Sequence, residues 1–294
     1  MIDFSGVYTA IITPFNRNGV IDYCVFKQQI EKQIEGGVNG IVVNSTTGEG
    51  FSLSEKDKQK NANFAQKQIK KRVKLIICVG EANITNTINS LNSFERYRPD
   101  AFLLNLPYFV KPNFSGLLKY VATCAKATSV PIVLYYVPKR SGQSLLTFQL
   151  IFLLNCHPNI VGIKFASDNL AQLSELAKQK DKFVLTGEDT LFEESLKLGA
   201  VGAISVISNA FPKIVSNFVK KYNHPNDVDY LNFQNIKPII KDLFLETNPV
   251  GIKHLLNLMS ANVGVPRLPL CEAGQELKDK LKEDLFKLKQ QKLI

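Results

Sequence analysis

The chain has 294 residues, of which 45% are hydrophobic, and it carries a formal net charge of +10. That length allows one large core or two ordinary domains, and no apolar run approaches the ~18 residues that a membrane span needs. The charge excess lies in lysine-rich helical segments such as residues 67–72 and 277–292. We therefore expect solvated amphipathic helices, no nucleic-acid partner and no membrane partner.

Cysteine, histidine and the N-terminus narrow the class of protein further. The five cysteines and three histidines are scattered, without a CxxC or HExxH pattern. Isolated thiols in a reducing compartment are expected, and no metal site. Residues 1–10 show no basic stretch followed by an apolar one, so we expect no signal peptide and a cytoplasmic protein.

Short β-rich runs recur along the chain, and each is followed by a helical pattern. The runs are 7–13, 40–44, 74–79, 101–106, 131–137, 160–166, 183–187 and 202–207. The helix after the second run begins with a capping pattern at Ser54 and Asp57. Another helix is expected at 114–128, with apolar residues on one face. Residues 211–294 contain no clear strand and read as further helices.

Eight strand–helix units in about 210 residues predict an α/β fold, a (β/α)8 TIM barrel. The barrel is expected to span residues 1–210, with a C-terminal helical region, 211–294, packed on it. The alternative is an open doubly wound sheet. Such a sheet usually has fewer strands and a Gly-rich phosphate loop after the first strand, and "TPFNRNG" is not such a loop.

The sixth run, "IVGIKFAS" at residues 160–167, places a lysine in an apolar strand. By strand alternation Gly162, Lys164 and Ala166 share one face, and the small pair leaves space inside the barrel near its C-terminal mouth. A lysine deprived of water has a lowered pKa, and its neutral amine can attack a carbonyl to form a Schiff base. The alternative is a structural lysine that pairs with a carboxylate or reaches solvent.

The segment "NSTTGEG", residues 44–50, follows the second strand directly. Thr46 and Thr47 precede a glycine there, in a strand-to-helix turn. Hydroxyls and backbone N–H groups in such a turn can hold a carboxylate. The alternative is a simple turn whose hydroxyls satisfy local backbone groups.

The segment "LYYVPKRSG", residues 134–142, ends the fifth strand. Tyr135 and Tyr136 point to opposite faces, so only one can enter the barrel, where a tyrosine could carry protons. Arg140 could clamp a substrate carboxylate with two parallel hydrogen bonds. The alternative is an aromatic core pair and a surface arginine.

Taken together, "STTGE", "YYVPKRSG" and "GIK", in this order and at these strand ends, resemble the dihydrodipicolinate synthase family. This family is also called the N-acetylneuraminate lyase superfamily of pyruvate-dependent class I aldolases. The resemblance runs through essentially the whole chain, with "TGED" at 186–189, "GAISVISN" at 202–209, "ETNPVGIK" at 246–253 and "RLPL" at 267–270. It implies a (β/α)8 barrel with C-terminal helices, in agreement with the pattern of strands.

The resemblance also implies a role for each candidate residue. Lys164 matches the Schiff-base lysine, and Tyr135 matches the tyrosine that relays protons over the imine. Thr47 matches the threonine that holds the pyruvate carboxylate, and Thr46 the one that passes protons onward. The other matches are two positions that line the pyruvate pocket and the arginine that receives the carboxylate of the second substrate: Gly187, the Ile204 backbone and Arg140. No cofactor is implied beyond the covalent Schiff base with pyruvate.

Arg140 favours the synthase branch of the family, because sialic-acid lyases and keto-deoxy-sugar aldolases commonly lack an arginine two residues after the proline. The implied reaction condenses pyruvate with aspartate semialdehyde to 4-hydroxy-tetrahydrodipicolinate, on the route to diaminopimelate and lysine. Two alternatives stay open: a pyruvate-releasing aldolase of the N-acetylneuraminate lyase or 2-keto-3-deoxy-sugar acid type, and a poorly active paralogue that binds a keto acid. The family usually forms homotetramers, as dimers of dimers, and the same assembly is expected here.

Three departures from the family pattern affect these expectations. Phe109 stands where a relay tyrosine from a neighbouring subunit is expected, so the Thr46–Tyr135 relay lacks its outer hydroxyl. Tyr136 stands where asparagine is usual, and its bulk would narrow or repack the site. In the family's allosteric lysine site Thr87 replaces a glutamate, so we expect weak or absent lysine feedback.

Overall fold

The structure is a computed structural model that describes residues 3–293. Residues 1, 2 and 294, at the ends of the two regions expected from the sequence, lie outside this range. Eight strands form a closed barrel in chain order, from β1 (Gly6–Ala10) to β8 (Gly202–Ser205). Because neighbouring strands are parallel and helices lie between them along the chain, the predicted (β/α)8 barrel is confirmed and the open doubly wound sheet is wrong.

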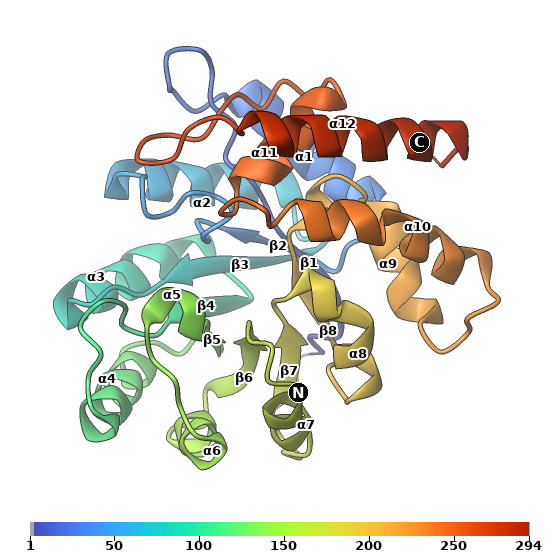
Figure 1. Ribbon diagram of the computed structural model, residues 1–294. Helices are drawn as coiled ribbons and strands as arrows, with labels where there is room; N and C mark the ends of the chain where they lie inside the picture. The colour runs from blue at the N-terminus through green and yellow to red at the C-terminus, as the bar shows by residue number, and fades with distance from the viewer. Residues whose placement is uncertain (1–2, 294) are drawn as a thin grey trace. The chain divides into compact units, whose positions relative to one another are not determined.

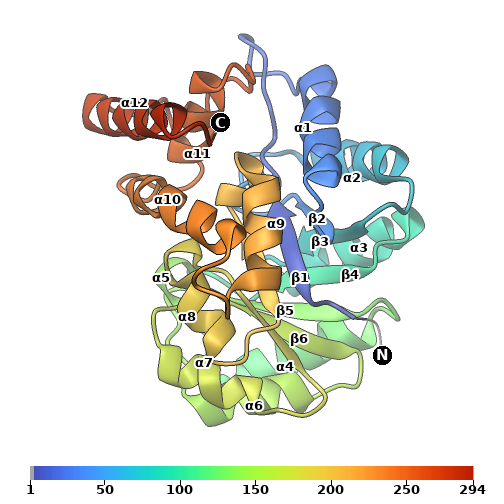
Figure 2. The same cartoon turned by 90° about the vertical axis from the view of Figure 1, so that its right-hand side faces the viewer.

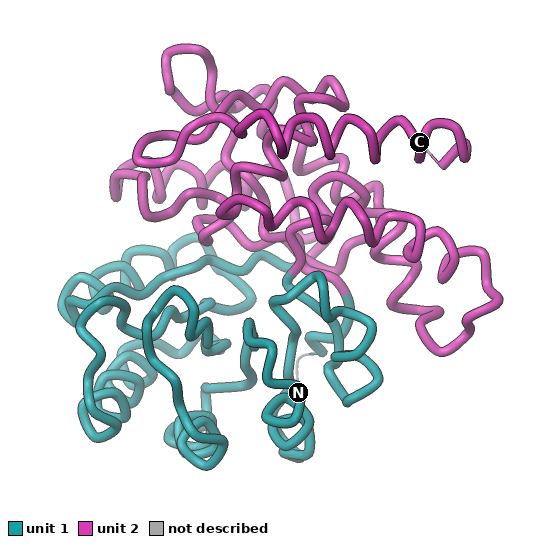
Figure 3. Tube along the Cα trace, viewed as in Figure 1, with its two compact units in different colours: residues 1–6, 74–204 teal, residues 7–73, 205–294 magenta. Residues whose placement is uncertain are grey.

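The chain divides into two compact units, coloured separately in Figure 3. Unit 1 comprises residues 1–6 and 74–204, and unit 2 comprises residues 7–73 and 205–294. In the described part of the chain no strand follows β8, so the expectation of helices beyond residue 210 is confirmed. The domain boundary expected after residue 210 stays a prediction.

Unit 1 alternates strands with helices (Figure 1). Its further strands are β3 (Lys74–Val79), β4 (Ala101–Asn105), β5 (Ile132–Tyr136), β6 (Ile160–Phe165) and β7 (Phe183–Thr186). Its α-helices are α3 (Ile84–Phe94), α4 (Phe114–Lys126), α5 (Pro138–Ser141), α6 (Thr147–Asn155), α7 (Leu170–Ala177) and α8 (Phe192–Lys197), with short 3₁₀ turns at Glu95–Tyr97 and Asp189–Leu191. The strands are almost wholly buried, as expected of a parallel sheet covered by helices.

Unit 2 holds most of β1, β2 (Gly40–Val43) and the C-terminal helices. Its helices are α1 (Tyr23–Glu35), α2 (Glu55–Ile69), α9 (Pro212–Lys221), α10 (Val228–Asp242), α11 (Val250–Leu258) and α12 (Gln275–Gln290), with a 3₁₀ turn at Ile207–Asn209. Figures 1 and 2 both show α9 beside α10. There the rings of Phe218 and Phe233 stack with centroids 3.8 Å apart, which buries a large apolar area between the two helices.

All eight predicted strands exist, but most end earlier than their apolar runs suggest. β1 stops at Ala10, although the run continues to residue 13. The Ile12 N–H donates to the Asn209 side chain at 3.1 Å, so the backbone there bonds to a side chain and not to a neighbouring strand. Residues 11–13 stay buried after the strand ends. An apolar run in the sequence indicates burial, and it does not show where the strand hydrogen bonds stop.

The helix patterns in the sequence are confirmed in detail. Ser54 caps α2, and its hydroxyl accepts the Asp57 N–H at 3.1 Å. Within the lysine-rich segment 277–292, α12 buries Leu281, Leu285 and Leu288, while most of the charged residues between them are exposed. The lysine-rich C-terminus is therefore an amphipathic helix, as expected.

The cysteines are free thiols, as the scattered spacing predicted. Cys24 and Cys271 are exposed, whereas Cys78 and Cys124 are buried. Burial raises the pKa of the Cys124 thiol to about 12. As for membrane crossing, residues 3–293 include no helix with the length and apolar character to span a bilayer.

We expect Cys24 and Cys271 to react with an aromatic disulfide reagent in a fast phase at pH 8, and Cys124 to react only after unfolding. A thiol with a pKa of about 12 is only ~10⁻⁴ thiolate at that pH, and the thiolate is the nucleophile. Absorbance of the released thiol measures the phases, and replacing Cys24 and Cys271 with serine should remove the fast phase. Rapid modification of Cys124 in the folded protein, located by mass spectrometry, would contradict this assignment.

Candidate active site

Lys164 lies within β6, in register with Tyr135 on β5 and with Leu185 on β7. Residues paired in a parallel ladder point to the same face of the sheet, so the lysine side chain meets the tyrosine ring. The Lys164 Nζ lies 4.1 Å from the Tyr135 ring centroid, and each residue is only 5% exposed. The amine is therefore held in one place, largely shielded from water, beside a ring that carries a hydroxyl.

Space for the lysine side chain comes from Gly187, immediately after β7. A Cβ at this position would lie 2.6 Å from Lys164 Cε and 2.9 Å from Ala166 Cβ. The expectation that Gly162 also leaves room beside Lys164 is wrong: a Cβ on Gly162 would lie 2.6 Å from the Phe183 ring, so that ring already fills the space. The space around the Lys164 amine therefore lies at the carboxyl ends of β6 and β7.

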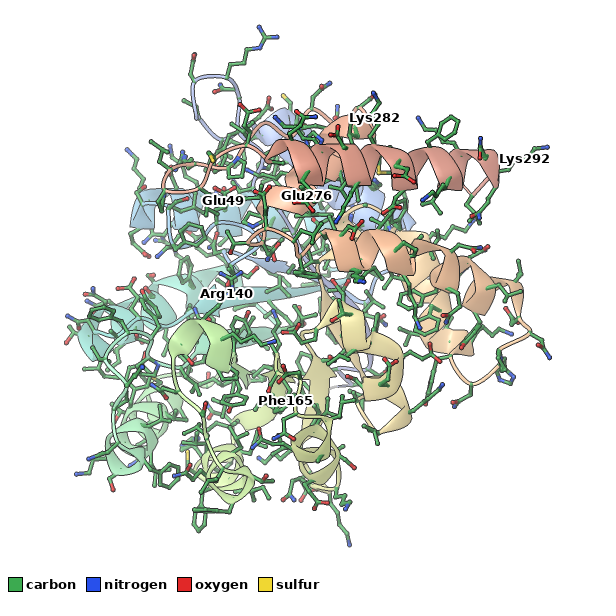
Figure 4. All side chains as sticks on the ribbon, in the orientation of Figure 1. Glu49, Arg140, Phe165, Glu276, Lys282 and Lys292 are labelled. Atoms are coloured by element: carbon green, nitrogen blue, oxygen red, sulfur yellow. The ribbon has the colours of Figure 1, made fainter. Side chains whose placement is uncertain are left out.

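Arg140 lies on the single-turn helix α5, directly after β5, and is labelled in Figure 4. It is exposed, as is the preceding Lys139, whose Nζ forms an ion pair with Asp168 at 3.1 Å. Asp168 follows β6, so this pair links the segments after two neighbouring strands. An arginine on such a segment can reach a carboxylate that approaches from solvent.

Glu188 is a charged neighbour of Lys164 that no local pattern in the sequence marks as one. It follows Gly187 within the "TGED" motif, which contributes to the family resemblance without showing what the acid lies near. Burial raises the pKa of its carboxyl, while the nearby charges of Lys139 and Lys164 act in the opposite direction. The motif already contained this acid, but only the fold brings it within electrostatic range of Lys164.

The threonine turn, residues 44–50 of unit 2, follows β2 and closes on itself. The Glu49 N–H donates to the Thr46 carbonyl, and the Gly50 N–H donates to the Ser45 carbonyl, both at 3.0 Å. Thr47 is 2% exposed, and its Oγ1 accepts a hydrogen bond from Asn248 Nδ2 at 2.9 Å. The Thr47 hydroxyl therefore bonds to a distant side chain, which a simple turn that satisfies its own backbone does not explain.

Ile204, the remaining candidate, lies in β8 and is 1% exposed. In unit 1 the structure thus brings Tyr135 on β5, and Gly187 just after β7, into direct proximity with Lys164 on β6. In the same unit, Arg140 follows β5 and Ile204 belongs to β8.

Comparison with known proteins identifies the family of the chain. The model of the Dihydrodipicolinate synthetase family matches residues 3–288. The chain belongs to this family. A 4-hydroxy-tetrahydrodipicolinate synthase from Methanocaldococcus jannaschii is 38% identical over 289 residues, which cover 97% of this chain and 98% of the relative. One from Hydrogenobaculum sp. is 36% identical over 290 residues, with 96% and 98% covered.

A solved structure of a family member is also similar in fold. The chloride-inhibited dihydrodipicolinate synthase from Acinetobacter baumannii, complexed with pyruvate, matches with a TM-score of 0.92. The two chains are 30% identical, and the match covers 99% of this chain and 100% of that one. The resemblance derived from the motifs is thus confirmed.

Tyr136, which departs from the usual residue of the dihydrodipicolinate synthetase family, lies away from the lysine. Its ring packs against Phe165, labelled in Figure 4, with centroids 5.6 Å apart. Its hydroxyl accepts the Leu145 N–H at 3.0 Å. The tyrosine therefore fills the face of β5 opposite Tyr135, and the expectation that it narrows the space at Lys164 is not supported by its position.

Phe109, the second departure from the family pattern, is 89% exposed. Its φ is +71°, a left-handed conformation that is unfavourable for a residue with a side chain. Tyr108 and Val110 beside it are 46% and 55% exposed, so the loop presents three apolar side chains to its surroundings. Phe109 has no hydroxyl, and the residue before it in the chain, Tyr108, has one.

Thr87, the third departure, is fully buried at the start of α3. Its hydroxyl lies 2.8 Å from the Tyr120 hydroxyl and accepts the Glu81 N–H at 3.0 Å, so it is engaged within the protein. This segment does contain a carboxylate, because Glu81 Oε2 accepts from Asn86 Nδ2 at 3.1 Å. Weak lysine feedback stays a prediction.

Gly187→Ala should displace the amine of Lys164, because the new Cβ would meet Lys164 Cε at 2.6 Å and the lysine chain can move more easily than the backbone. A displacement of about 1 Å in a reacting group can lower a rate by ~10²-fold. The expected result is a correspondingly slower borohydride trapping of pyruvate, together with a lower melting temperature, because Ala166 Cβ at 2.9 Å cannot move aside as the lysine chain can. Gly116→Ala on the exposed face of α4 is the matched control, and equal trapping rates in both variants would refute the assignment.

Tyr136→Phe should lower the free energy of unfolding by about 1–3 kcal/mol, since it leaves the Leu145 N–H without its acceptor. The same variant should trap pyruvate as fast as wild type, because the ring faces away from Lys164. Urea denaturation and the trapping rate are the two measurements. Tyr135→Phe should give the reverse pattern, and a slow Tyr136→Phe enzyme of normal stability would contradict the stated orientation.

Proposed function

We propose that the chain is a 4-hydroxy-tetrahydrodipicolinate synthase, a lyase that condenses pyruvate with aspartate semialdehyde in diaminopimelate and lysine biosynthesis. Two relatives with this name match over nearly their full length, and a similar solved structure contains pyruvate. The observation that carries the proposal is the Lys164 amine, 4.1 Å from the Tyr135 ring centroid on adjoining strands.

In the proposed first step the Lys164 Nζ adds to the C2 carbonyl carbon of pyruvate. The carbonyl oxygen takes up two protons and leaves as water, which gives an imine between the lysine and C2. The protonated imine withdraws electrons from C3, so a C3 proton can depart and an enamine forms. Shielding of the site, with Lys164 only 5% exposed, protects the imine from hydrolysis.

Tyr135 is the proposed proton carrier in these steps, because its ring lies next to the amine and a phenol can both donate and accept a proton. The enamine carbon then attacks the aldehyde carbon of the second substrate, and the aldehyde oxygen takes up a proton. The amine of that substrate next attacks the imine carbon, which closes the ring and releases Lys164. Arg140 is proposed to hold the carboxylate of the second substrate.

Thr47 is proposed to hold the pyruvate carboxylate and Thr46 to pass protons onward, with Gly187 and the Ile204 backbone lining the pyruvate pocket. Support for these roles comes from the match to the family pattern and from the ordered turn that carries both threonines. Phe109 leaves the outer position of the relay to water or to Tyr108. A relay that lacks an acid–base group is slower by ~10²–10⁴-fold.

The proposal includes an assembly and a location. We propose a homotetramer, a dimer of dimers, in the cytoplasm. The exposed Tyr108, Phe109 and Val110 support contact with a second copy, because exposed apolar groups gain free energy when they are covered. Five free cysteines agree with a reducing compartment. The covalent imine supplies the electron sink, so the proposed reaction calls for no further cofactor.

Borohydride reduction in the presence of pyruvate tests the imine. Mass spectrometry should show one reduced pyruvate adduct per chain, located at Lys164 by peptide mapping. Lys164→Ala should abolish the adduct, while Lys139→Ala, which removes another lysine of the same unit, should retain it. No adduct at saturating pyruvate would leave only the keto-acid-binding paralogue.

A coupled assay identifies the second substrate. With aspartate semialdehyde the enzyme should consume pyruvate, and Arg140→Ala should raise the KM for the semialdehyde more than the KM for pyruvate. Arg140→Lys keeps the charge without the two-pronged geometry and should restore only part of the affinity. Release of pyruvate from N-acetylneuraminate or a 2-keto-3-deoxy-sugar acid, with no condensation, would identify the aldolase alternative instead.

A further inference from the structure

The threonine turn of unit 2 is contacted by the segment that begins α11. Asn248 precedes this helix by two residues, and its Nδ2 donates to Thr47 Oγ1 at 2.9 Å. Thr47 and Asn248 are 201 positions apart in the chain. Thr47 is 2% exposed, so this contact is made away from bulk water, where a hydrogen bond is directional and costly to lose.

A second contact joins the same helix to the same turn. Lys253 Nζ lies 2.5 Å from Glu49 Oε1, and these two side chains are 1% and 0% exposed. Glu49, which Figure 4 labels, follows Thr47 by two residues. Burial lowers the pKa of Lys253 to about 8, while the nearby Glu49 carboxylate acts in the opposite direction and favours the charged form of the lysine. A pair this dry holds its geometry closely, because separating the charges would leave both of them unsolvated.

The surroundings of the ion pair are also ordered. Lys253 Nζ lies 4.1 Å from the Phe15 ring centroid, and the Arg267 guanidinium carbon lies 4.4 Å from the same centroid. The Arg267 backbone N–H donates to the second carboxylate oxygen of Glu49 at 2.8 Å. Glu49 is therefore bound on both oxygens, and the turn is fixed two residues beyond Thr47.

We propose that Asn248 is a positioning residue that sets the direction of the Thr47 hydroxyl proton, with the Lys253–Glu49 pair holding the turn in place for this contact. The inference rests on the proposed function, in which Thr47 holds the pyruvate carboxylate. A hydroxyl has one proton to donate. When its oxygen accepts from the Asn248 amide, that proton stays available for an anion. The Asn248–Thr47 bond thus makes the threonine a donor towards the carboxylate.

Asn248→Asp tests this polarity, because a carboxylate would accept the Thr47 proton and direct the oxygen lone pairs at the substrate. The readout is borohydride trapping with pyruvate and with methyl pyruvate, a neutral ester of the same keto acid. The pyruvate concentration for half-maximal trapping should rise ~10-fold or more, the size expected for a lost hydrogen bond to a charged group. The value for methyl pyruvate should change little, so the preference for the anion should fall.

Asn257→Asp is the matched control. It makes the same chemical change on α11, where Asn257 Nδ2 donates to the Gly264 carbonyl at 2.9 Å. It should lower the melting temperature but keep the preference for pyruvate over the ester. Equal loss of preference in both variants would mean that α11 acts through stability alone, which overturns the inference.

A double-mutant cycle with Thr47→Val tests whether Asn248 acts through the threonine. If it does, the double variant should bind pyruvate no more weakly than Thr47→Val alone. Additive losses would show an independent role for Asn248 and overturn the proposal. No adduct with wild-type protein overturns the proposed function, and the inference with it, whereas a wild-type adduct with unchanged preference in Asn248→Asp overturns the inference alone.

The holding role of the ion pair is tested by Lys253→Met combined with Glu49→Gln. This double variant removes both buried charges at nearly constant volume, and the amide oxygen introduced at position 49 can still accept from the Arg267 N–H. The variant should stay folded, with half-maximal trapping shifted ~5-fold or more to higher pyruvate. Wild-type affinity and preference in this variant would remove the ion pair from the proposal.

Discussion

The site depends on the register of three parallel strands, β5, β6 and β7. Lys164 is paired with Tyr135 on one side and with Leu185 on the other. The same register continues past β7, where the Gly187 N–H donates to the Phe165 carbonyl at 2.8 Å. It thereby places a residue without a side chain against Lys164 Cε. A slip of one residue would turn the lysine to the opposite face, so the chemistry proposed for it relies on backbone hydrogen bonds.

The threonine turn follows a different principle, since its conformation is not one that the chain adopts readily. Asn44 and Glu49 have φ values of +60° and +56°, and such left-handed residues each cost on the order of 1–3 kcal/mol. Contacts from far along the chain hold the turn: Asn248 on Thr47, and Lys253 and Arg267 on Glu49. A mobile loop would lose more conformational entropy on binding a carboxylate than this turn, which is already held in place.

The repeated pattern of strands and helices was predictable, because burial imposes a period on each element. The strand ends were less so, since Ile12 is buried whether its N–H bonds to a strand or to Asn209. The space expected at Gly162 was wrong for a related reason: a missing side chain does not reveal which neighbour fills the gap, and here it is the Phe183 ring. Glu188 and Asn248 lie within the "TGED" and "ETNPVGIK" motifs, but nothing in the local sequence indicates which residues they contact.

The helices and strands of this protein, and the kinds of group at their ends, follow from local sequence: a lysine on an apolar strand, adjacent threonines after β2, and a tyrosine and an arginine around the end of β5. These are local properties, set by side-chain chemistry and by the period of the backbone. Which of these groups touch depends on the folded chain. The Tyr135 ring against Lys164, the Phe183 ring in the space at Gly162 and the Asn248 amide on Thr47 join residues distant in the chain, and packing selects such pairs.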